Sequence, residues 1–535
     1  MIHRTSSSSG TLSDPTDVRD WVFDPELVHR LVADVHGSGS TFRRSPFDER
    51  KLADIPESST DDVARAFAGA REAQEEWAAV PVRRRAQVLL RFHDLLLARQ
   101  EEILDLIQLE TGKTRLHALE EVLASAAVVR HYGRAAHSYL KPRRRGGAIP
   151  GVTRTVEVRH PVGVVGQIVP WNYPLALTVS DALPALAAGN AVVTKPDTQS
   201  ALSTLWVREL LVEAGLPREV WRTVIGEGPV VGRAVVEHAD YACFTGSTRT
   251  GREVGRRAAD RLVGCSLELG GKNAMIVFED ADLDRAVDGA LRGCFASAGQ
   301  LCMSIERIYV HEVVAAEFLA AFAQRTAALR LGADLEYGPD MGSLVSRQQL
   351  RTVQEHVADA VAKGAEVVVG GRPRPDLGPL FHEPTVLSGV DASMRVFAEE
   401  TFGPVVSVHR FADESEAAAF ANDTDYGLNA SVWTRDGARG RAFAARLRTG
   451  MVNVNESYAS AFGSVGSPMG GRKSSGLGRR HGAEGIQRFT ESQTIAQQRL
   501  LPMAPFALGP LKVEGAGYAA FMTRSLRLLK QLRLR

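Results

Sequence analysis

Apolar and polar positions alternate along the chain in a pattern that predicts a mixed α/β protein. Between residues 154 and 260, short apolar runs such as VGVVGQIV (162–169) and AVVTK (191–195) alternate with helical stretches such as 175–189 and 201–215. Strands of this length between helices of about 10 to 15 residues are typical of βαβ units. The strands are apolar throughout, as expected where helices cover both faces of a parallel sheet.

The same alternation returns after residue 270 and predicts a second parallel-sheet unit. NAMIVF (273–278) and MVNVN (451–455) have the composition of buried strands, and 282–298 has helical spacing. Ahead of the first sheet, three helices are predicted, the first beginning at Asp61 after capping residue types and the others covering 82–110 and 116–137. The chain is long enough for two to four structural units.

Irregular segments separate these units. KPRRRGG (141–147) is predicted to be a solvated loop rather than a phosphate-binding patch, and 456–480 a Gly/Ser-rich loop. Residues 154–160 and 486–498 alternate polar and apolar side chains, so we expect them to pair outside the core. The Ser-rich residues 1–23 are predicted to form a flexible tail without a secretory signal.

The C-terminal segment, 499–535, is a basic tail with an amphipathic helical pattern. Its apolar stripe is Tyr518, Phe521, Met522, Leu526, Leu529 and Leu532, and the cations beside it are Arg524, Arg527, Lys530 and Arg533. A helix of this kind can lie on an anionic membrane. Packing on a neighbouring subunit, or disorder, is the interpretation we favour.

Composition excludes several classes of function. The net charge is +1, so no overall field favours nucleic acid or a membrane surface. No run of 18 apolar residues predicts a membrane-spanning helix. The four cysteines, 243, 265, 294 and 302, form no CxxC pair and no zinc spacing with histidine, so no metal site is expected. Few cysteines in a long chain suit a reducing compartment, here the cytoplasm.

Three short motifs carry candidate catalytic chemistry. Cys302 lies in FASAGQLCMSIER (295–307), Glu268 in LELGGK (267–272), and Asn172 between two prolines in PWNYP (170–174). A thiol can serve as a nucleophile, a carboxylate as a base, and an amide in a stiff turn as a donor to a developing oxyanion. Each residue also has an ordinary interpretation, because a lone cysteine is usually a buried apolar residue and asparagine is a common turn former.

Other motifs suggest a nucleotide site. Gly246 and Ser247 lie in FTGSTRTG (244–251), between a strand and a helix, where a pyrophosphate meets helix N–H groups. Lys195 ends a parallel strand, at the edge of the sheet where ligands bind. Glu400 and Phe402 in EETFGP (399–404) could accept ribose hydroxyls and flank a nicotinamide. None of these signals is specific alone.

Together, and in this order, the motifs PWNYP, KP, FTGSTRTG, LELGGK, GQLC, ETFGP and PMGGRKSSGLGRR resemble the aldehyde dehydrogenase superfamily, over about residues 50–497. The resemblance implies a Rossmann-like cofactor domain at 24–268, interrupted by an arm segment at 141–160. It further implies a catalytic domain at 269–485 and an oligomerisation arm strand at 486–498. Members use such arms to form homodimers or homotetramers.

The resemblance also implies a role for each motif residue. Cys302 would attack the aldehyde, Asn172 and the Cys302 N–H would hold the oxyanion, and Glu268 would activate the water that hydrolyses the thioester. Since relatives that transfer the acyl group to coenzyme A generally lack this glutamate, a free carboxylic acid is the expected product. The implied cofactor contacts are Trp171, Lys195, Pro196, Thr198, Gly246, Ser247, Leu269, Glu400 and Phe402.

One position bears on the choice of cofactor. In relatives that prefer NAD, a glutamate three residues after the lysine commonly binds the ribose 2′-hydroxyl and would repel a 2′-phosphate. Here that position is Thr198, so NADP is expected, with NAD as an alternative. Asp197 would weaken this inference if its carboxylate points inward.

The closest resemblance is to bacterial NADP-dependent succinate-semialdehyde dehydrogenases. Well-studied enzymes of that activity bind the substrate carboxylate with arginines at positions that are Ala296 and Ser180 here. The loop 456–475 could supply other groups, namely Ser457, Ser460, Ser464, Ser467 and Arg472. The alternatives are a broad dehydrogenase for apolar or aromatic aldehydes, and a catalytically silent structural or membrane-associated relative.

Overall fold

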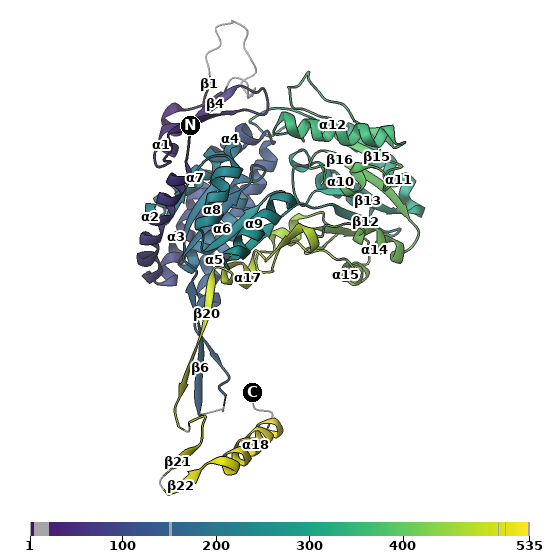
Figure 1. Cartoon of the computed structure of the whole chain (residues 1–535). Helices are drawn as coiled ribbons and strands as arrows, with labels where there is room; N and C mark the ends of the chain where they lie inside the picture. Colours follow the sequence, from purple (N-terminus) through teal and green to yellow (C-terminus); the bar gives the residue numbers. More distant parts are fainter. Residues whose placement is uncertain (1, 5–20, 149–151, 501, 509, 533–535) are drawn as a thin grey trace.

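Two α/β lobes lie side by side, and a long two-segment arm extends from the first of them (Figure 1). The computed structural model describes residues 2–4, 21–148, 152–500, 502–508 and 510–532. The predicted fold class, two parallel-sheet α/β units with a small β arm, is confirmed. Each lobe is built around its own sheet, and the candidate catalytic residues lie on the loops where the two lobes meet.

The first sheet has the strand order β19-β11-β10-β7-β8-β9. Its parallel strands are β7 (Val164–Val169), β8 (Ala191–Pro196), β9 (Trp221–Thr223), β10 (Tyr241–Thr245) and β11 (Gly264–Glu268). The helices of this lobe are α1 (Pro25–Val32), α2 (Thr60–Ala79), α3 (Val82–Ala98), α4 (Gln100–Thr111), α5 (Arg115–Leu140), α6 (Pro174–Ala188), α7 (Ala201–Glu213), α8 (Arg233–His238) and α9 (Thr248–Asp260). Helix α6 is buried along its whole length, which explains its nearly continuous apolar sequence.

The second sheet has the order β14-β15-β16-β13-β12-β17-β18. Its strands are β12 (Asn273–Val277), β13 (Ile305–His311), β14 (Glu366–Val369), β15 (Thr385–Ser388), β16 (Val405–Phe411), β17 (Ala430–Trp433) and β18 (Asn453–Val454). Its helices are α10 (Leu283–Phe295), α11 (Glu312–Ala327), α12 (Arg347–Ala362), α13 (Arg395–Ala398), α14 (Glu414–Asn422) and α15 (Gly437–Ala444). All neighbouring strands run parallel except the β14–β15 pair.

The arm consists of β6 (Thr153–Pro161) paired antiparallel with β20 (Thr490–Gln498), with β5 (Arg143–Arg145) on its other edge. The predicted pairing of 154–160 with 486–498 is therefore present. The prediction of a loop for 141–147 is wrong at its centre, because Arg143–Arg145 adds a third strand and Arg145 pairs with Glu157. Figure 1 shows this arm extending away from both lobes.

The loop predicted at 456–480 contains more structure than its Gly/Ser content suggests. It includes the short helix α16 (Ala459–Gly463) and the strand β19 (Gly476–Leu477), which pairs antiparallel with β11 at the edge of the first sheet. A segment that follows the second sheet thus returns to the first lobe. It continues into α17 (Gly482–Gln487), which packs against α6.

Smaller corrections concern the ends of the chain and the first helices. The helix predicted over 82–110 is divided into α3 and α4 at Arg99, whose φ of −115° leaves the helical region. Most of the tail 1–23 lies outside the described residues, but β1 (Ile2–Arg4) and β2 (Trp21–Phe23) pair with each other. A hairpin of β3 (Gly39–Arg44) and β4 (Lys51–Glu57) precedes α2.

The predicted amphipathic helix of the C-terminal tail is present as α18 (Gly515–Gln531), after the hairpin β21 (Phe506–Leu508) and β22 (Leu511–Val513). Figure 1 places this helix beyond the end of the arm, away from both lobes. None of its residues is buried. No helix among the described residues is long and apolar enough to span a membrane.

Candidate active site between the two sheets

The parallel strands of the first sheet end together at one edge, which is where ligands bind in such sheets. Strand β7 runs into the Pro170–Pro174 turn, β10 into Gly246, and β11 ends on Glu268. The second lobe brings Cys302 to this edge on the loop between α10 and β13. Residues far apart in the sequence thus meet because of the strand order.

The Cys302 loop has an unusual backbone. Ser297, Ala298 and Gly299 are consecutive left-handed residues, with φ of 51°, 55° and 70°. The side chain of Gln300 stabilises this path by donating to the Ser297 carbonyl at 3.1 Å and accepting from the Val345 N–H at 2.9 Å. Left-handed backbone at non-glycine residues such as Ser297 and Ala298 persists only where surrounding contacts impose it, and here it shapes the loop that carries Cys302.

Asn172 is held by a buried ion pair. Lys113 Nζ donates to the Asn172 carbonyl at 2.6 Å and to Glu121 at 2.7 Å. The other Glu121 oxygen accepts from the Leu175 N–H at 2.9 Å, at the start of α6. The Asn172 amide donates one hydrogen to the Gln300 carbonyl at 3.0 Å, which leaves its second hydrogen for another acceptor. Neither Lys113 nor Glu121 lies in a motif singled out from the sequence, so neither residue was predicted.

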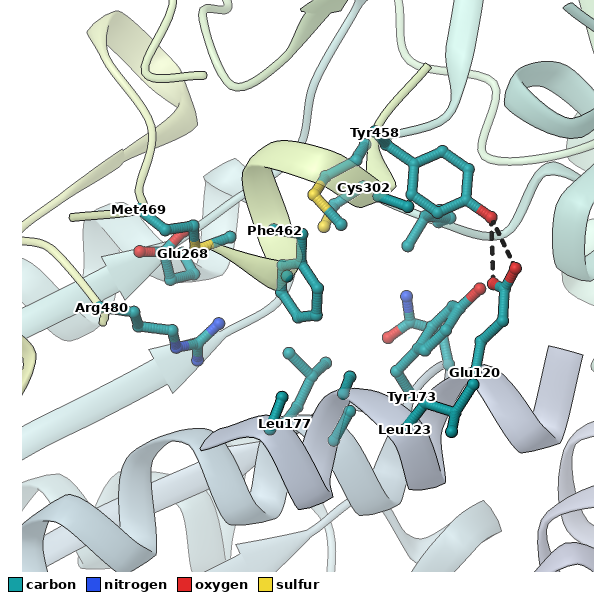
Figure 2. Close-up of a pocket in the computed structure, with 18 of the residues that line it drawn as sticks. Glu120, Leu123, Tyr173, Leu177, Glu268, Cys302, Tyr458, Phe462, Met469 and Arg480 are labelled. Atoms are coloured by element: carbon teal, nitrogen blue, oxygen red, sulfur yellow. Dashed lines mark hydrogen bonds between the residues drawn. The ribbon is translucent and has the colours of Figure 1, made fainter. Parts of the chain in front are cut away.

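Two chambers meet at these residues. One, of about 230 Å³, and another, of about 250 Å³, share Asn172, Glu268 and Cys302 in their walls. Figure 2 shows Cys302 and Glu268 in the first chamber with the aromatic ring of Phe462 close by. The nucleophile, the amide donor and the carboxylate proposed from sequence therefore lie in one place.

Burial at this junction raises the pKa values of its acidic side chains. Burial raises the pKa of the Cys302 thiol to about 12, with the Glu268 and Glu400 carboxylates adding to the shift. Burial also raises the pKa of Glu268 to about 7, against the opposing charge of Arg480. Glu268 Oε1 is buried with no hydrogen-bond partner in the described part of the chain. A carboxylate with a pKa near 7 can act as a base or an acid at neutral pH.

The second chamber collects most of the residues expected to contact a nucleotide. Its lining includes Trp171, Gly246, Ser247, Leu269, Glu400 and Phe402. The rings of Trp171 and Phe402 pack edge to face, with 5.6 Å between their centroids. Ser247 caps α9 by accepting from the Thr250 N–H, so the N-terminus of this 13-residue helix opens beside the chamber.

Glu400 is fixed against a glycine turn. Its Oε1 accepts from the Gly271 N–H at 2.8 Å, and burial together with the Glu306 charge raises its pKa to about 8. A Cβ at Gly270 would lie 2.2 Å from Glu400 Oε2, so any larger residue there would displace the Glu400 carboxylate. Glu306 in turn bonds to Lys272 and accepts from the Thr401 and Phe402 N–H groups. Sequence reasoning missed this Lys272–Glu306 pair, although both residues lie in motifs it used.

Lys195, Pro196 and Thr198 line neither chamber and lie at the end of β8, next to β7. The pKa of Lys195 is lowered by burial, while Asp197 and Glu227 act in the opposite direction. Asp197 accepts from the Gln199 N–H at 2.9 Å, and its charge also acts on Arg43. The Asp197 carboxylate therefore does face this region.

Arg43 lies in no motif singled out from the sequence and was not predicted. It lies on β3, only 8% exposed, and its Nε is buried without a partner in the described residues. Strand β3 is joined to the turn at 198–200 by a hydrogen bond from Gln199 Nε2 to the Arg44 carbonyl at 2.8 Å. A second buried cation thus accompanies Lys195 at this end of β8.

The first chamber is mainly apolar. Residues from α5, α6 and the 456–475 loop form most of its wall, including Leu123, Ala124, Ala127, Tyr173, Ala176, Leu177, Leu301, Met303, Ala459, Phe462, Gly463 and Met469. Its charged residues are Glu120, Glu268, Arg292 and Arg480. None of the four serines or Arg472, predicted as carboxylate ligands, lines it; Ser457, for example, bonds to the Gly289 carbonyl instead. That prediction is wrong.

No group of three or more metal-binding side chains occurs in the part of the chain that the structure describes. The chain matches the model of the aldehyde dehydrogenase family over residues 36–495, and it belongs to that family. It is 52% identical over 486 residues to a protein of Mycolicibacterium smegmatis, covering 91% of this chain and 93% of that one, provisionally named a succinate-semialdehyde dehydrogenase for NADP+. A betaine aldehyde dehydrogenase of Bacillus subtilis is 37% identical and covers 84% of this chain.

Solved structures agree. Betaine aldehyde dehydrogenase from Staphylococcus aureus, in complex with NAD+, superposes with a TM-score of 0.84 at 32% identity, covering 89% of this chain and 97% of that one. An E. coli structure described as an NADP-dependent enzyme gives a TM-score of 0.83 at 34% identity, covering 87% and 96%. Both relatives support the family and leave the substrate of this chain open.

Proposed function

We propose that this protein oxidises an aldehyde to the free carboxylic acid, using NADP and a covalent intermediate on Cys302. The observation that carries the proposal is that Cys302, Glu268 and Asn172 form the shared wall of the two chambers. One chamber can hold the aldehyde and the other the nicotinamide end of the cofactor. NADPH absorbance, followed with a panel of aldehydes, tests this directly.

The protein residues divide the reaction into two parts. Cys302 Sγ adds to the aldehyde carbonyl as the thiolate, after its proton has passed to solvent water, and Glu268 is not required for this step. After hydride leaves the thiohemiacetal carbon, a thioester remains on Cys302. Glu268 then takes a proton from water, the hydroxyl oxygen adds to the thioester carbon, and the C–S bond breaks to release the acid and the thiolate.

Asn172 is proposed to hold the oxyanion in both parts, together with the Cys302 N–H. Its fixed position, imposed by Lys113 and Gln300, makes the free amide hydrogen a preorganised donor.

Replacing Asn172 by alanine is expected to lower kcat by about 100- to 1,000-fold, the usual effect of losing one such donor. Steady-state kinetics would measure the loss, and cofactor binding followed by fluorescence should stay close to wild type. Asn422→Ala, at a partly exposed asparagine outside both chambers, is a matched control. A fall of less than about fivefold in kcat for Asn172→Ala would contradict the assignment.

The residues of the second chamber fit a dinucleotide. A diphosphate and a flat ring would be accommodated by the glycine turn at Gly270, the open N-terminus of α9 and the Trp171–Phe402 pair. When bound, NADP would supply the acceptor for the hydride. Glu400 and Phe402 would hold its nicotinamide riboside, while Gly246, Ser247 and Leu269 would lie beside the diphosphate. Lys195, Pro196 and Thr198 would lie beside the adenosine ribose.

For the 2′-phosphate, we propose that Arg43 acts with Lys195. Arg43→Gln is expected to reduce the preference for NADP over NAD, as a ratio of kcat/KM, by about 10-fold, because a charge-assisted hydrogen bond is lost. Calorimetric titration with 2′,5′-ADP and 5′-AMP gives a readout without turnover, and only the first should bind more weakly. Arg44→Gln, at the exposed neighbour, is the matched control. An unchanged ratio would remove Arg43 from the site.

Two substrate classes are candidates. Succinic semialdehyde is supported by the names of the mycobacterial relatives. An apolar or aromatic aldehyde is supported by the apolar wall of the first chamber. Comparing kcat/KM for succinic semialdehyde with that for nonanal decides between them.

The remaining proposals concern the whole molecule. We propose that residues 24–268 form the cofactor domain and that residues 269–485 form the catalytic domain. The exposed β20 edge of the arm supports a homodimer or homotetramer, since unpaired strand edges seek partners. The four free cysteines support a cytoplasmic location.

A further inference from the structure

A cluster of two charged residues and a tyrosine lies in the wall of the mainly apolar first chamber. It consists of Glu120 on α5, Arg292 on the last turn of α10, and Tyr458 at the start of the 456–475 loop. The Tyr458 hydroxyl donates to Glu120 at 3.0 Å, as Figure 2 shows. Elsewhere the wall of the first chamber includes Tyr173, Met303 and Phe462 among other apolar side chains, which suit a methylene chain better than charge.

The two arginines of the chamber differ in how fully they are paired. Arg480 is 2% exposed, and it donates to both oxygens of Asp181 at 2.8 and 2.6 Å. Its Nε and Nη2 are thus engaged by Asp181 and Thr245 of the first lobe. Arg292 is 43% exposed and reaches Glu120 at 3.6 Å and Glu456 at 3.5 Å. Charge-assisted bonds are normally about 2.7 to 2.9 Å, so Arg292 retains donor capacity for a further anion.

We infer that Arg292 binds a negative group at the far end of the aldehyde substrate, and that Glu120 opposes it and tunes the preference. This inference rests on the proposed function and specifies its substrate: a short aldehyde with a distal carboxylate. A carboxylate cannot enter an apolar chamber without a partner, and Arg292 is the lining cation that can supply one. The Tyr458 hydroxyl bonds to Glu120 at 3.0 Å, and the Arg292 guanidinium lies over the Tyr458 ring, 5.1 Å from its centroid.

The same cluster predicts discrimination by charge in both directions. Glu120 would repel a carboxylate and attract a cationic aldehyde, whereas Arg292 would do the reverse. Three aldehydes therefore test this discrimination by charge: succinic semialdehyde (negative), butanal (neutral) and betaine aldehyde (positive). The measured quantity is kcat/KM for each charged aldehyde divided by that for butanal.

For Arg292→Gln, the ratio for succinic semialdehyde should fall by about 10- to 100-fold, chiefly through KM, and the ratio for betaine aldehyde should rise. For Glu120→Gln, both ratios should move in the opposite direction, by about 3- to 10-fold. Arg285→Gln, at an exposed arginine on the same helix outside the chamber, should change neither ratio. Thermal unfolding of each variant checks that the fold is intact.

Specific outcomes would overturn the inference. A change of less than about twofold in the succinic semialdehyde ratio of Arg292→Gln would do so, as would a wild-type preference for betaine aldehyde over succinic semialdehyde. Either result, with butanal still oxidised, would leave the dehydrogenase proposal standing. If the wild type oxidised none of the three aldehydes, both this inference and the proposed function would be contradicted.

Discussion

Replacing Cys302 by serine is expected to lower kcat/KM for aldehyde oxidation by about 10⁴- to 10⁶-fold, the range seen when a covalent nucleophile is lost. Serine preserves the volume of the side chain, but its hydroxyl is far less acidic and a weaker nucleophile than the thiol. Burial raises the pKa of the Cys302 thiol to about 12, and a serine hydroxyl in the same place would be still harder to deprotonate. A serine there would remain protonated.

The experiment needs a matched thiol. Cys265 is half-buried on β11, its pKa is also raised by burial, and it lines neither chamber. Cys265→Ser should therefore retain wild-type kinetics, and both variants should bind NADPH as the wild type does. If Cys302→Ser kept more than about 1% of the wild-type rate, another residue would have to be the nucleophile. If Cys265→Ser lost activity equally, the cause would be structural.

The three candidate catalytic residues could be selected from the sequence because their motifs occur together and in the order of a known family. Glu268 ends a strand and Asn172 follows one, and parallel strands share a ligand-binding edge. The alternation placed Asn172 just after a predicted strand, but the strand that ends on Glu268 was not predicted, and the roles of both residues were implied by the family resemblance. The role of Cys302 was predicted from the family resemblance alone, since the residue type by itself is typical of an ordinary buried cysteine.

The residues that support the trio could not be predicted in the same way. Lys113 bonds to the carbonyl of Asn172, 59 residues away, and Glu306 accepts from the N–H of Thr401, 95 residues away. Such contacts depend on how helices and loops pack, which one-dimensional periodicity does not describe. A buried lysine or glutamate has the same sequence signature as an exposed one until its partner is known.

The 456–480 segment shows the limit of composition most clearly. Its serines and glycines predicted a polar loop, and its serines were proposed as substrate ligands. In the structure, Tyr458, Phe462 and Met469 from this segment line the first chamber instead. The few large side chains of a Gly/Ser-rich loop turn inward because burying them is the main favourable term that orders such a loop. Arg292 was overlooked for the opposite reason, since a lone arginine on a helix is usually solvated.

Replacing Glu268 by glutamine is expected to stop turnover after the first cycle. Glutamine keeps the shape of the side chain but cannot accept a proton, so the thioester on Cys302 would hydrolyse about 100- to 10,000-fold more slowly. Rapid mixing should show a burst of about one NADPH per active site, followed by a much slower steady rate. A slow rate without a burst would place the defect before thioester formation and contradict the assignment to water activation. Glu237→Gln, on the solvent side of α8, is the matched control.

The pH dependence tests the same residue in the wild-type protein. Burial raises the pKa of Glu268 to about 7, so below this pH the carboxyl is mostly protonated and cannot act as a base. The steady rate should therefore rise through about pH 7 by a factor approaching 10 per pH unit on the acid side, and then level off. In Glu268→Gln the residual rate should lose this inflection. Persistence of an unchanged inflection in the variant would assign it to another group, such as Glu400, whose pKa burial raises to about 8.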